Sequence, residues 1–163
     1  MIRNARLTDA QDICDIYNYY IQNTTITFEE KELDKGEIEK RIKEVINKYP
    51  WFVNEEDGRV TGYAYAGLWK WRAAYRNTVE VTVYVEKNST GKGIGRKLLE
   101  VLLEELSKNN IHCVIGGIAL PNAASIELHE KLGFIKCAHF TQVGYKFGEW
   151  IDVEYWQKHL ERK

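Results

Sequence analysis

Three glycines, Gly91, Gly93 and Gly95, alternate with larger residues in the segment NSTGKGIGRKLL at residues 88–99. Glycine has no side chain, so backbone N–H groups in such a segment can converge on an anion. The amphipathic segment that follows predicts a helix, whose first turn adds unpaired amides and a partial positive charge. Basic side chains flank the glycines, at Lys87, Lys92, Arg96 and Lys97. The pattern favours a phosphate-binding loop at a helix N-terminus; a solvated loop before a helix is the alternative.

Two common phosphate-binding motifs do not fit this segment. A Walker A loop needs a glycine separated from Gly91 by four residues, where the chain has Glu86, and Ser or Thr where it has Gly93. A dinucleotide fingerprint needs a third glycine at the position of Arg96 or Leu98. The segment therefore follows neither of these two phosphate-binding patterns.

A second cluster with chemical potential is Trp69-Lys70-Trp71-Arg72-Ala73-Ala74-Tyr75. Arg72 can bind a carboxylate through two hydrogen bonds, and Lys70 adds a point charge. Two cations between two indoles would suit an acceptor that carries a carboxylate and a second anionic or strongly polar group. The alternative is an ordinary exposed loop with cation–π contacts.

Periodicity predicts the elements that must position these residues. A capping box formed by Thr8 and Gln11 predicts a helix from about Thr8 to Ile21. A second helical pattern runs over residues 38–46, and two strands should flank a turn at Asp57-Gly58. Strict alternation over residues 78–85 predicts a strand with Glu80, Thr82 and Tyr84 on one face.

The second half of the chain continues the alternation of helix and strand. We expect a helix from Ile94 to about Lys108, a strand over residues 112–120, and a short helix that Asn122 caps and Gly133 ends. One or two strands and a Trp-rich tail should follow. These elements predict a single mixed α/β domain over residues 1–163.

Composition narrows the functional class. The net charge of −1 over 163 residues gives no overall positive electrostatic field that would attract nucleic acid. The three cysteines are an odd number and far apart, which predicts reduced thiols in a cytoplasmic protein and no zinc or other metal site. We expect neither a signal peptide nor a membrane span, because no apolar run approaches the ~18 residues of a span.

The segment NSTGKGIGRKLLEVLLEEL after VEVTVYV resembles the acyl-CoA loop of the GNAT superfamily of N-acetyltransferases. The family pattern, Arg/Gln-x-x-Gly-x-Gly/Ala, falls on Thr90, Gly93 and Gly95, so Thr90 departs from it and loses one side-chain contact. The segment ALPNAASIELHEKLGF is similar to the family's other helix. A closer resemblance, to the phosphinothricin and methionine sulfone acetyltransferases, rests on IYNYYIQNTTITF, YAGLWKWRAAYRNTVEVTVYV, LHEKLGF and GYKFGEWIDVEYWQ.

The resemblance implies a GNAT acyl-CoA N-acyltransferase fold, with a mostly antiparallel central sheet and flanking helices. It also implies acetyl transfer from acetyl-CoA to the α-amino group of a small amino-acid-like acceptor, directly within a ternary complex. Relatives are homodimers, so a homodimer is expected here. The residues expected to bind acetyl-CoA are Val83, Tyr84, Val85, Gly91, Lys92, Gly93, Ile94, Gly95, Arg96, Asn122 and Ser125.

The same resemblance implies two catalytic residues. Glu80 would accept the proton of the acceptor ammonium, through a water relay, because an ordinary carboxylate is a poor base for an ammonium. His129 would protonate the leaving thiolate. Each has a simpler interpretation: Glu80 as a surface carboxylate, and His129 as a buried residue that orients its helix. Asn122, Ser125 and His129 share one helix face by their spacing.

On the acceptor side, the expected residues are Phe28, Lys70, Arg72, Tyr75 and Thr82. Two other functions remain open. One is acetylation of a different amine, such as a polyamine, although the basic Lys70 and Arg72 do not suit a polycation. The other is a non-catalytic sensor that binds acyl-CoA, which Thr90 leaves open and which Glu80 and His129 disfavour.

Overall fold

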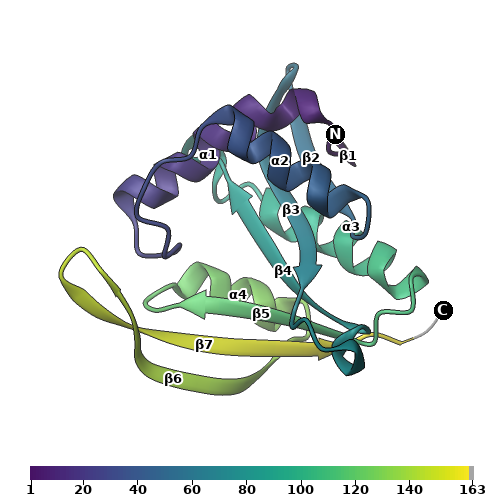
Figure 1. Ribbon diagram of the computed structural model, residues 1–163, viewed down its shortest axis with the longest axis vertical. Helices are drawn as coiled ribbons and strands as arrows, with labels where there is room; N and C mark the ends of the chain where they lie inside the picture. Colours follow the sequence, from purple (N-terminus) through teal and green to yellow (C-terminus); the bar gives the residue numbers. More distant parts are fainter. Residues whose placement is uncertain (162–163) are drawn as a thin grey trace.

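A computed structural model describes residues 1–161, and its framework is one twisted sheet (Figure 1). Over these residues the strand order is β1-β2-β3-β4-β5-β7-β6, and every neighbouring pair is antiparallel except β4 and β5. This confirms the predicted mixed α/β fold with a mostly antiparallel sheet. The strands are β1 (Ile2–Asn4), β2 (Trp51–Glu56), β3 (Arg59–Leu68), β4 (Thr78–Val85), β5 (Cys113–Ala119), β6 (Ile135–Lys146) and β7 (Glu149–His159).

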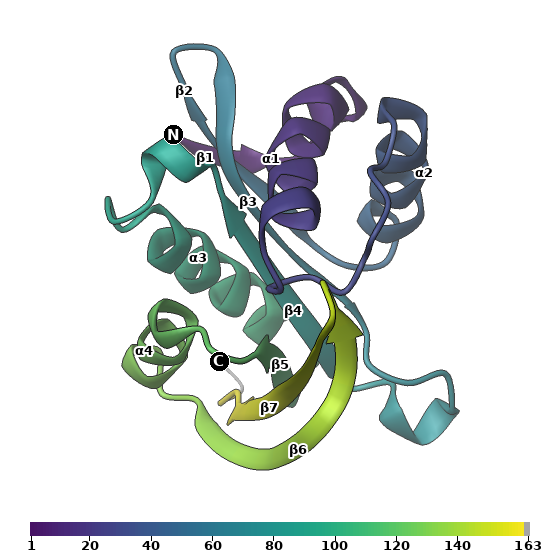
Figure 2. The same ribbon diagram turned by 90° about the vertical axis from the view of Figure 1, so that its left-hand side faces the viewer.

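Helices cover both faces of the sheet, as Figure 2 shows. The helices α1 (Ala10–Asn23) and α2 (Lys35–Ile46) pack on one face, around Ile13, Ile42 and Val53. On the other face, α3 (Ile94–Lys108) buries a leucine-rich stripe, and α4 (Ala123–Lys131) lies beside β5. Burial of each leucine contributes roughly 1.5–3 kcal/mol, which fixes α3 and so fixes the glycine loop before it.

The parallel pair β4–β5 determines where a site can form. Its register includes only Thr78–Glu80 against Cys113–Ile115, and the last pair is Glu80 with Ile115. Beyond this point β4 stays paired with β3, and β5 stays paired with β7. The two strands therefore separate in the middle of the sheet, with Glu80 at the point of divergence.

The N-terminus of α1 differs from the sequence prediction. A short 3₁₀ turn, Leu7–Asp9, precedes the helix, which begins at Ala10 and not at Thr8. Asp9, not Thr8, provides the polar contacts: its carboxylate accepts hydrogen bonds from Arg6 N–H and from both terminal nitrogens of Arg3. The predicted Thr8 capping box is wrong, because a carboxylate paired with a guanidinium binds more strongly than a threonine hydroxyl.

The C-terminal third forms a long hairpin. The expected Trp-rich tail is part of β7, which pairs with both β5 and β6. The tip of the hairpin contacts the connection between α1 and α2 through two hydrogen bonds of Lys146, and Figure 2 shows the two segments near one another. The short strand β1 was not predicted; it pairs with β2 over three residues.

Candidate active site

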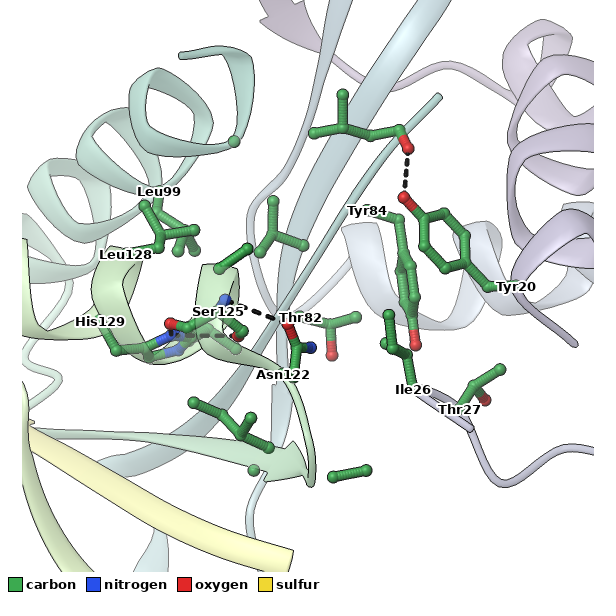
Figure 3. A pocket seen from close by; sticks show the side chains of 18 of the residues that line it. Tyr20, Ile26, Thr27, Thr82, Tyr84, Leu99, Asn122, Ser125, Leu128 and His129 are labelled. Atoms are coloured by element: carbon green, nitrogen blue, oxygen red, sulfur yellow. Dashed lines mark hydrogen bonds between the residues drawn. The ribbon is translucent and has the colours of Figure 1, made fainter. Parts of the chain in front are cut away.

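A cavity of about 1300 Å³ lies where β4 and β5 separate (Figure 3). Its walls come from β4, β5, the start of α3, α4, the α1–α2 connection and the β6–β7 hairpin. Ligand pockets are usually about 300–1000 Å³. The cavity therefore has room for a long carrier molecule and a second, smaller reactant.

The glycine loop lines one end of this cavity. Gly91 and Gly93 both have φ of +77°, a left-handed conformation that other residues adopt at a cost. Gly93 is the N-cap of α3, and among residues 1–161 no side chain caps that helix start. The first amides of α3 are therefore free for an anion. A Cβ at Gly95 would make ordinary contacts, 3.5 Å from Val85 and 3.7 Å from Leu128, so this turn of α3 lies directly against β4 and α4.

The structure gathers most of the predicted carrier-binding residues around the cavity. Those that line it are Val83, Tyr84, Val85, Gly91, Gly93, Ile94, Gly95, Arg96, Asn122 and Ser125. Lys92 is exposed and outside the lining. Thr90, at the departure from the family pattern, lines the cavity while its hydroxyl donates to the Lys87 carbonyl at 3.0 Å.

Glu80 lies in the cavity wall, at the point of strand divergence. Burial raises the pKa of the Glu80 carboxyl above its ordinary value. Gly117 on the opposite wall leaves room for the Glu80 side chain. A Cβ at Gly117 would lie only 3.2 Å from Glu80 Oε1 and 3.2 Å from the Tyr155 ring, which is tighter than most such contacts. Burial, followed by the nearby Glu80 charge, also raises the pKa of Tyr155. Glu80 is thus a partly desolvated carboxyl group in the wall between the separating strands.

The helix α4 presents its polar face to the same space. Asn122 Oδ1 accepts from the Ser125 N–H at 3.1 Å, which confirms the predicted cap. His129 is buried, and its Nδ1 lies 2.8 Å from the Ser125 carbonyl oxygen. A carbonyl only accepts, so we assign the hydrogen to Nδ1 and the lone pair to Nε2. Burial lowers the pKa of His129, so the ring is neutral at neutral pH.

The opposite end of the cavity is formed by the α1–α2 connection, the β6–β7 hairpin and the middle of β4. Phe28 and Thr82, predicted to contact the acceptor, line it. Lys70, Arg72 and Tyr75 do not: they lie on an exposed loop outside the cavity of this chain. Lys70 Nζ is 5.4 Å from the centre of the Trp69 ring, and the Arg72 guanidinium is 4.9 Å from that of Trp71.

One contact connects that loop to the cavity. The Trp69 ring meets Tyr155, which lines the cavity, edge to face at 5.4 Å between ring centres. Because Lys70 contacts Trp69, it is connected to the cavity wall through that ring. Arg72 has no comparable connection within residues 1–161 of this chain.

Comparison with known proteins agrees with this geometry. Residues 2–155 match the family model described as acetyltransferase (GNAT) domain. The chain belongs to the GNAT acetyltransferases. It is an acetyl-CoA-dependent N-acetyltransferase, with acetyl-CoA as the acetyl donor.

No helix of residues 1–161 combines the length and apolar character needed to cross a membrane.

Three individual comparisons place this GNAT acetyltransferase more closely. It is 39% identical to phosphinothricin N-acetyltransferase of Streptomyces viridochromogenes, over 98% of this chain and 87% of that protein. It is 40% identical to L-methionine sulfoximine/L-methionine sulfone acetyltransferase of Salmonella typhimurium, over 98% and 94%. A phosphinothricin acetyltransferase of Sinorhizobium meliloti, solved in complex with AcCoA, superposes with a TM-score of 0.95 at 33% identity, over 98% and 88%.

Several wall residues of this acetyltransferase were missed by sequence reasoning. They come from the α1–α2 connection and the hairpin: Ile26, Thr27, Phe140, Val143, Val153 and Tyr155. Tyr155 belongs to the segment expected as a Trp-rich tail, and only the pairing of β7 with β5 places it opposite Gly117. No local pattern marks these residues, because segments more than 100 residues apart bring them together.

Proposed function

We propose that this enzyme acetylates the α-amino group of small amino acids of the phosphinothricin, methionine sulfone or methionine sulfoximine type. The names of its relatives support this substrate class. The observation that carries the proposal is Glu80, a partly desolvated carboxylate at the point where the carrier groove meets the acceptor end. This is where a base must lie if an amine is to attack a thioester held between the strands.

In this proposal the carrier end binds acetyl-CoA mainly through backbone amides and the positive end of a helix. Amides of residues 91–96 would donate to the diphosphate of acetyl-CoA, supported by the partial positive charge of the α3 start. The separated β4 edge, from Val81 to Val85, would hold the pantetheine arm. Tyr20 already donates to the Val85 carbonyl at 2.6 Å, so the arm would use other backbone groups.

Glu80 would accept the ammonium proton, directly or through one water. An α-amino group has a pKa near ~8, so much of it is protonated at neutral pH. An ordinary carboxylate is too weak a base for this step, and burial of Glu80 reduces that mismatch. The free amine then attacks the carbonyl carbon, and acetyl moves directly to nitrogen as the thiolate leaves, without an acetyl-enzyme.

His129 is the candidate for the thiolate proton. Its Nδ1 is held by the Ser125 carbonyl, so only Nε2 can exchange a proton. Because the resting ring is neutral, Nε2 must first take a proton from water or from the acceptor. The same contact also orients the ring on α4, and the two roles separate in the Asn variant described in the Discussion.

Lys70, Arg72 and Tyr75 fit this function as part of a larger assembly. Large aromatic side chains are exposed on this loop and on the hairpin, including Trp71 at 78% and Trp150 at 64% exposed. We propose a homodimer that covers these rings and brings the basic loop to an acceptor. Sedimentation of the purified enzyme should give twice the 19.1 kDa chain mass; a monomer at micromolar concentration would contradict it.

For the cellular location we propose the cytoplasm, because Cys14, Cys113 and Cys137 are all free thiols.

An acetylation screen tests the proposed substrate class. The enzyme is mixed with acetyl-CoA and single amines, and release of the free CoA thiol is followed. We expect release with phosphinothricin, methionine sulfone and methionine sulfoximine, and little with polyamines or peptide N-termini. Release only with polyamines or peptides would contradict the acceptor class, and saturable acetyl-CoA binding without release would favour an acyl-CoA sensor.

A further inference from the structure

Lys146, near the tip of the hairpin, is a buried lysine that the proposed chemistry does not use. Its side chain is only 1% exposed. Burial of an ammonium is costly unless hydrogen bonds replace its water. Lys146 Nζ donates to two backbone carbonyls, of Thr24 at 2.9 Å and Thr27 at 2.8 Å. Both belong to the α1–α2 connection, more than 100 residues away in sequence.

A second contact joins the same two segments. Gly144, two residues before Lys146, lies against the Phe28 ring, and a Cβ there would overlap Phe28 Cζ. Thus the hairpin holds the connection by a charged side chain at one point and by close packing at another. Thr27 is also fixed from the other side, because its hydroxyl is 2.8 Å from the Tyr17 hydroxyl.

Both joined segments form walls of the cavity at its acceptor end. Ile26, Thr27 and Phe28 line it from the connection, and Phe140 and Val143 line it from the hairpin. Lys146 itself does not line the cavity, so it acts through the segments that it joins. The glycine loop at the carrier end is held by α3 and β4, and the two Lys146 hydrogen bonds do not reach it.

We propose that Lys146 is a positioning residue that closes the acceptor end of the active site. Its ammonium holds residues 24–28 against the hairpin, so the amino-acid pocket has its final shape before the acceptor binds. The inference rests on the proposed function in one respect, the assignment of this end of the cavity to the acceptor. The proposal predicts that Lys146 affects the affinity for the acceptor and does not affect the affinity for acetyl-CoA.

The test is Lys146→Met, which keeps the aliphatic packing and removes both hydrogen bonds. We expect KM for the acceptor to rise about 10-fold, since two charge-assisted bonds to the wall are lost, and KM for acetyl-CoA to stay within about 2-fold. Lys136→Met is the matched control: Lys136 is on the same strand, pairs with Glu154, and does not contact the connection. The control should leave both constants unchanged.

Gly144→Ala is the second variant, because it disturbs the same junction without touching the buried charge. It should displace Phe28 and give the same selective rise in the acceptor KM. An equal rise in the KM of acceptor and acetyl-CoA, or an unchanged acceptor KM in both variants, would overturn the proposal.

Hydrogen exchange provides a readout independent of the acceptor assignment. Amides of residues 24–28 should exchange at least about 10-fold faster in Lys146→Met, and those of α3 should not change. If these amides exchange faster but the acceptor KM stays constant, the junction exists and the acceptor-end assignment fails. If they do not exchange faster, the Lys146 junction itself is refuted.

Discussion

Replacement of Glu80 by Gln tests the proposed base directly. The amide keeps the shape of the side chain between β4 and Gly117, so the cavity is preserved while the basic group is lost. General-base catalysis contributes about 10²–10⁴-fold. At the low end, kcat should fall about 10²-fold, which is about 2.7 kcal/mol in the barrier at 1.36 kcal/mol for each factor of ten. KM for acetyl-CoA should change little, because Glu80 lies outside the glycine loop.

The pH dependence gives the same prediction a second readout. Because burial raises the pKa of Glu80, the acid limb of kcat/KM should lie above the ordinary range of a glutamate, and it should disappear in Glu80→Gln. Thiol release with methionine sulfone, measured from pH 5 to 9, provides the profile. A kcat within about 3-fold of wild type, or an acid limb that persists in the variant, would refute the role of Glu80.

Stability should respond with a defined sign. The folded state favours the protonated carboxyl, so the wild type loses stability as the pH rises from the unfolded pKa of Glu80 through its higher folded pKa. The Gln variant has no such loss. Urea unfolding should therefore show Glu80→Gln gaining stability relative to wild type across this window, with no further gain above it.

Three other substitutions separate the parts of the site. Gly93→Ala should lower the free energy of unfolding in urea by roughly 1–2 kcal/mol and raise KM for acetyl-CoA. The φ of Gly93 is +77°, and a Cβ would meet nothing within 4 Å, so the cost comes from backbone strain and not from a clash. Unchanged stability would contradict this backbone argument. Arg72→Ala should raise KM for the amino acid and spare KM for acetyl-CoA; a joint rise in steady-state assays would exclude the loop as an acceptor site. His129→Asn, whose amide can replace Nδ1 on the Ser125 carbonyl, should lower kcat about 10²-fold if Nε2 moves a proton. A kcat within about 3-fold would leave His129 only an orienting role.

Local patterns in the sequence predicted the elements at the carrier end. The alternation over residues 78–85 and the leucine spacing after Gly95 are each contained in one element, and the structure has both as predicted. The Asn122 cap also depends on residues three apart. Such features follow from backbone geometry and short-range hydrogen bonds, so the sequence alone is sufficient to find them.

The acceptor end could not be found in the same way. Its walls depend on the separation of β4 from β5 and on the pairing of the hairpin with β5. Both features are set by the pairing of the whole sheet and not by a local sequence pattern. The Lys146 contact with Thr24 joins residues 122 positions apart. The α1 start was misplaced for a related reason, since the strong pairing of Arg3 with Asp9 outweighs the local capping pattern of Thr8.

The most direct test of the central claim is a crystal structure of the enzyme with bound acetyl-CoA. The account predicts diphosphate oxygens within hydrogen-bond distance of the amides of residues 91–96, and a pantetheine arm between Val81–Val85 and Gly116–Ala119 that brings the thioester to Glu80. A diphosphate bound away from the α3 start, or a thioester far from Glu80, would contradict it.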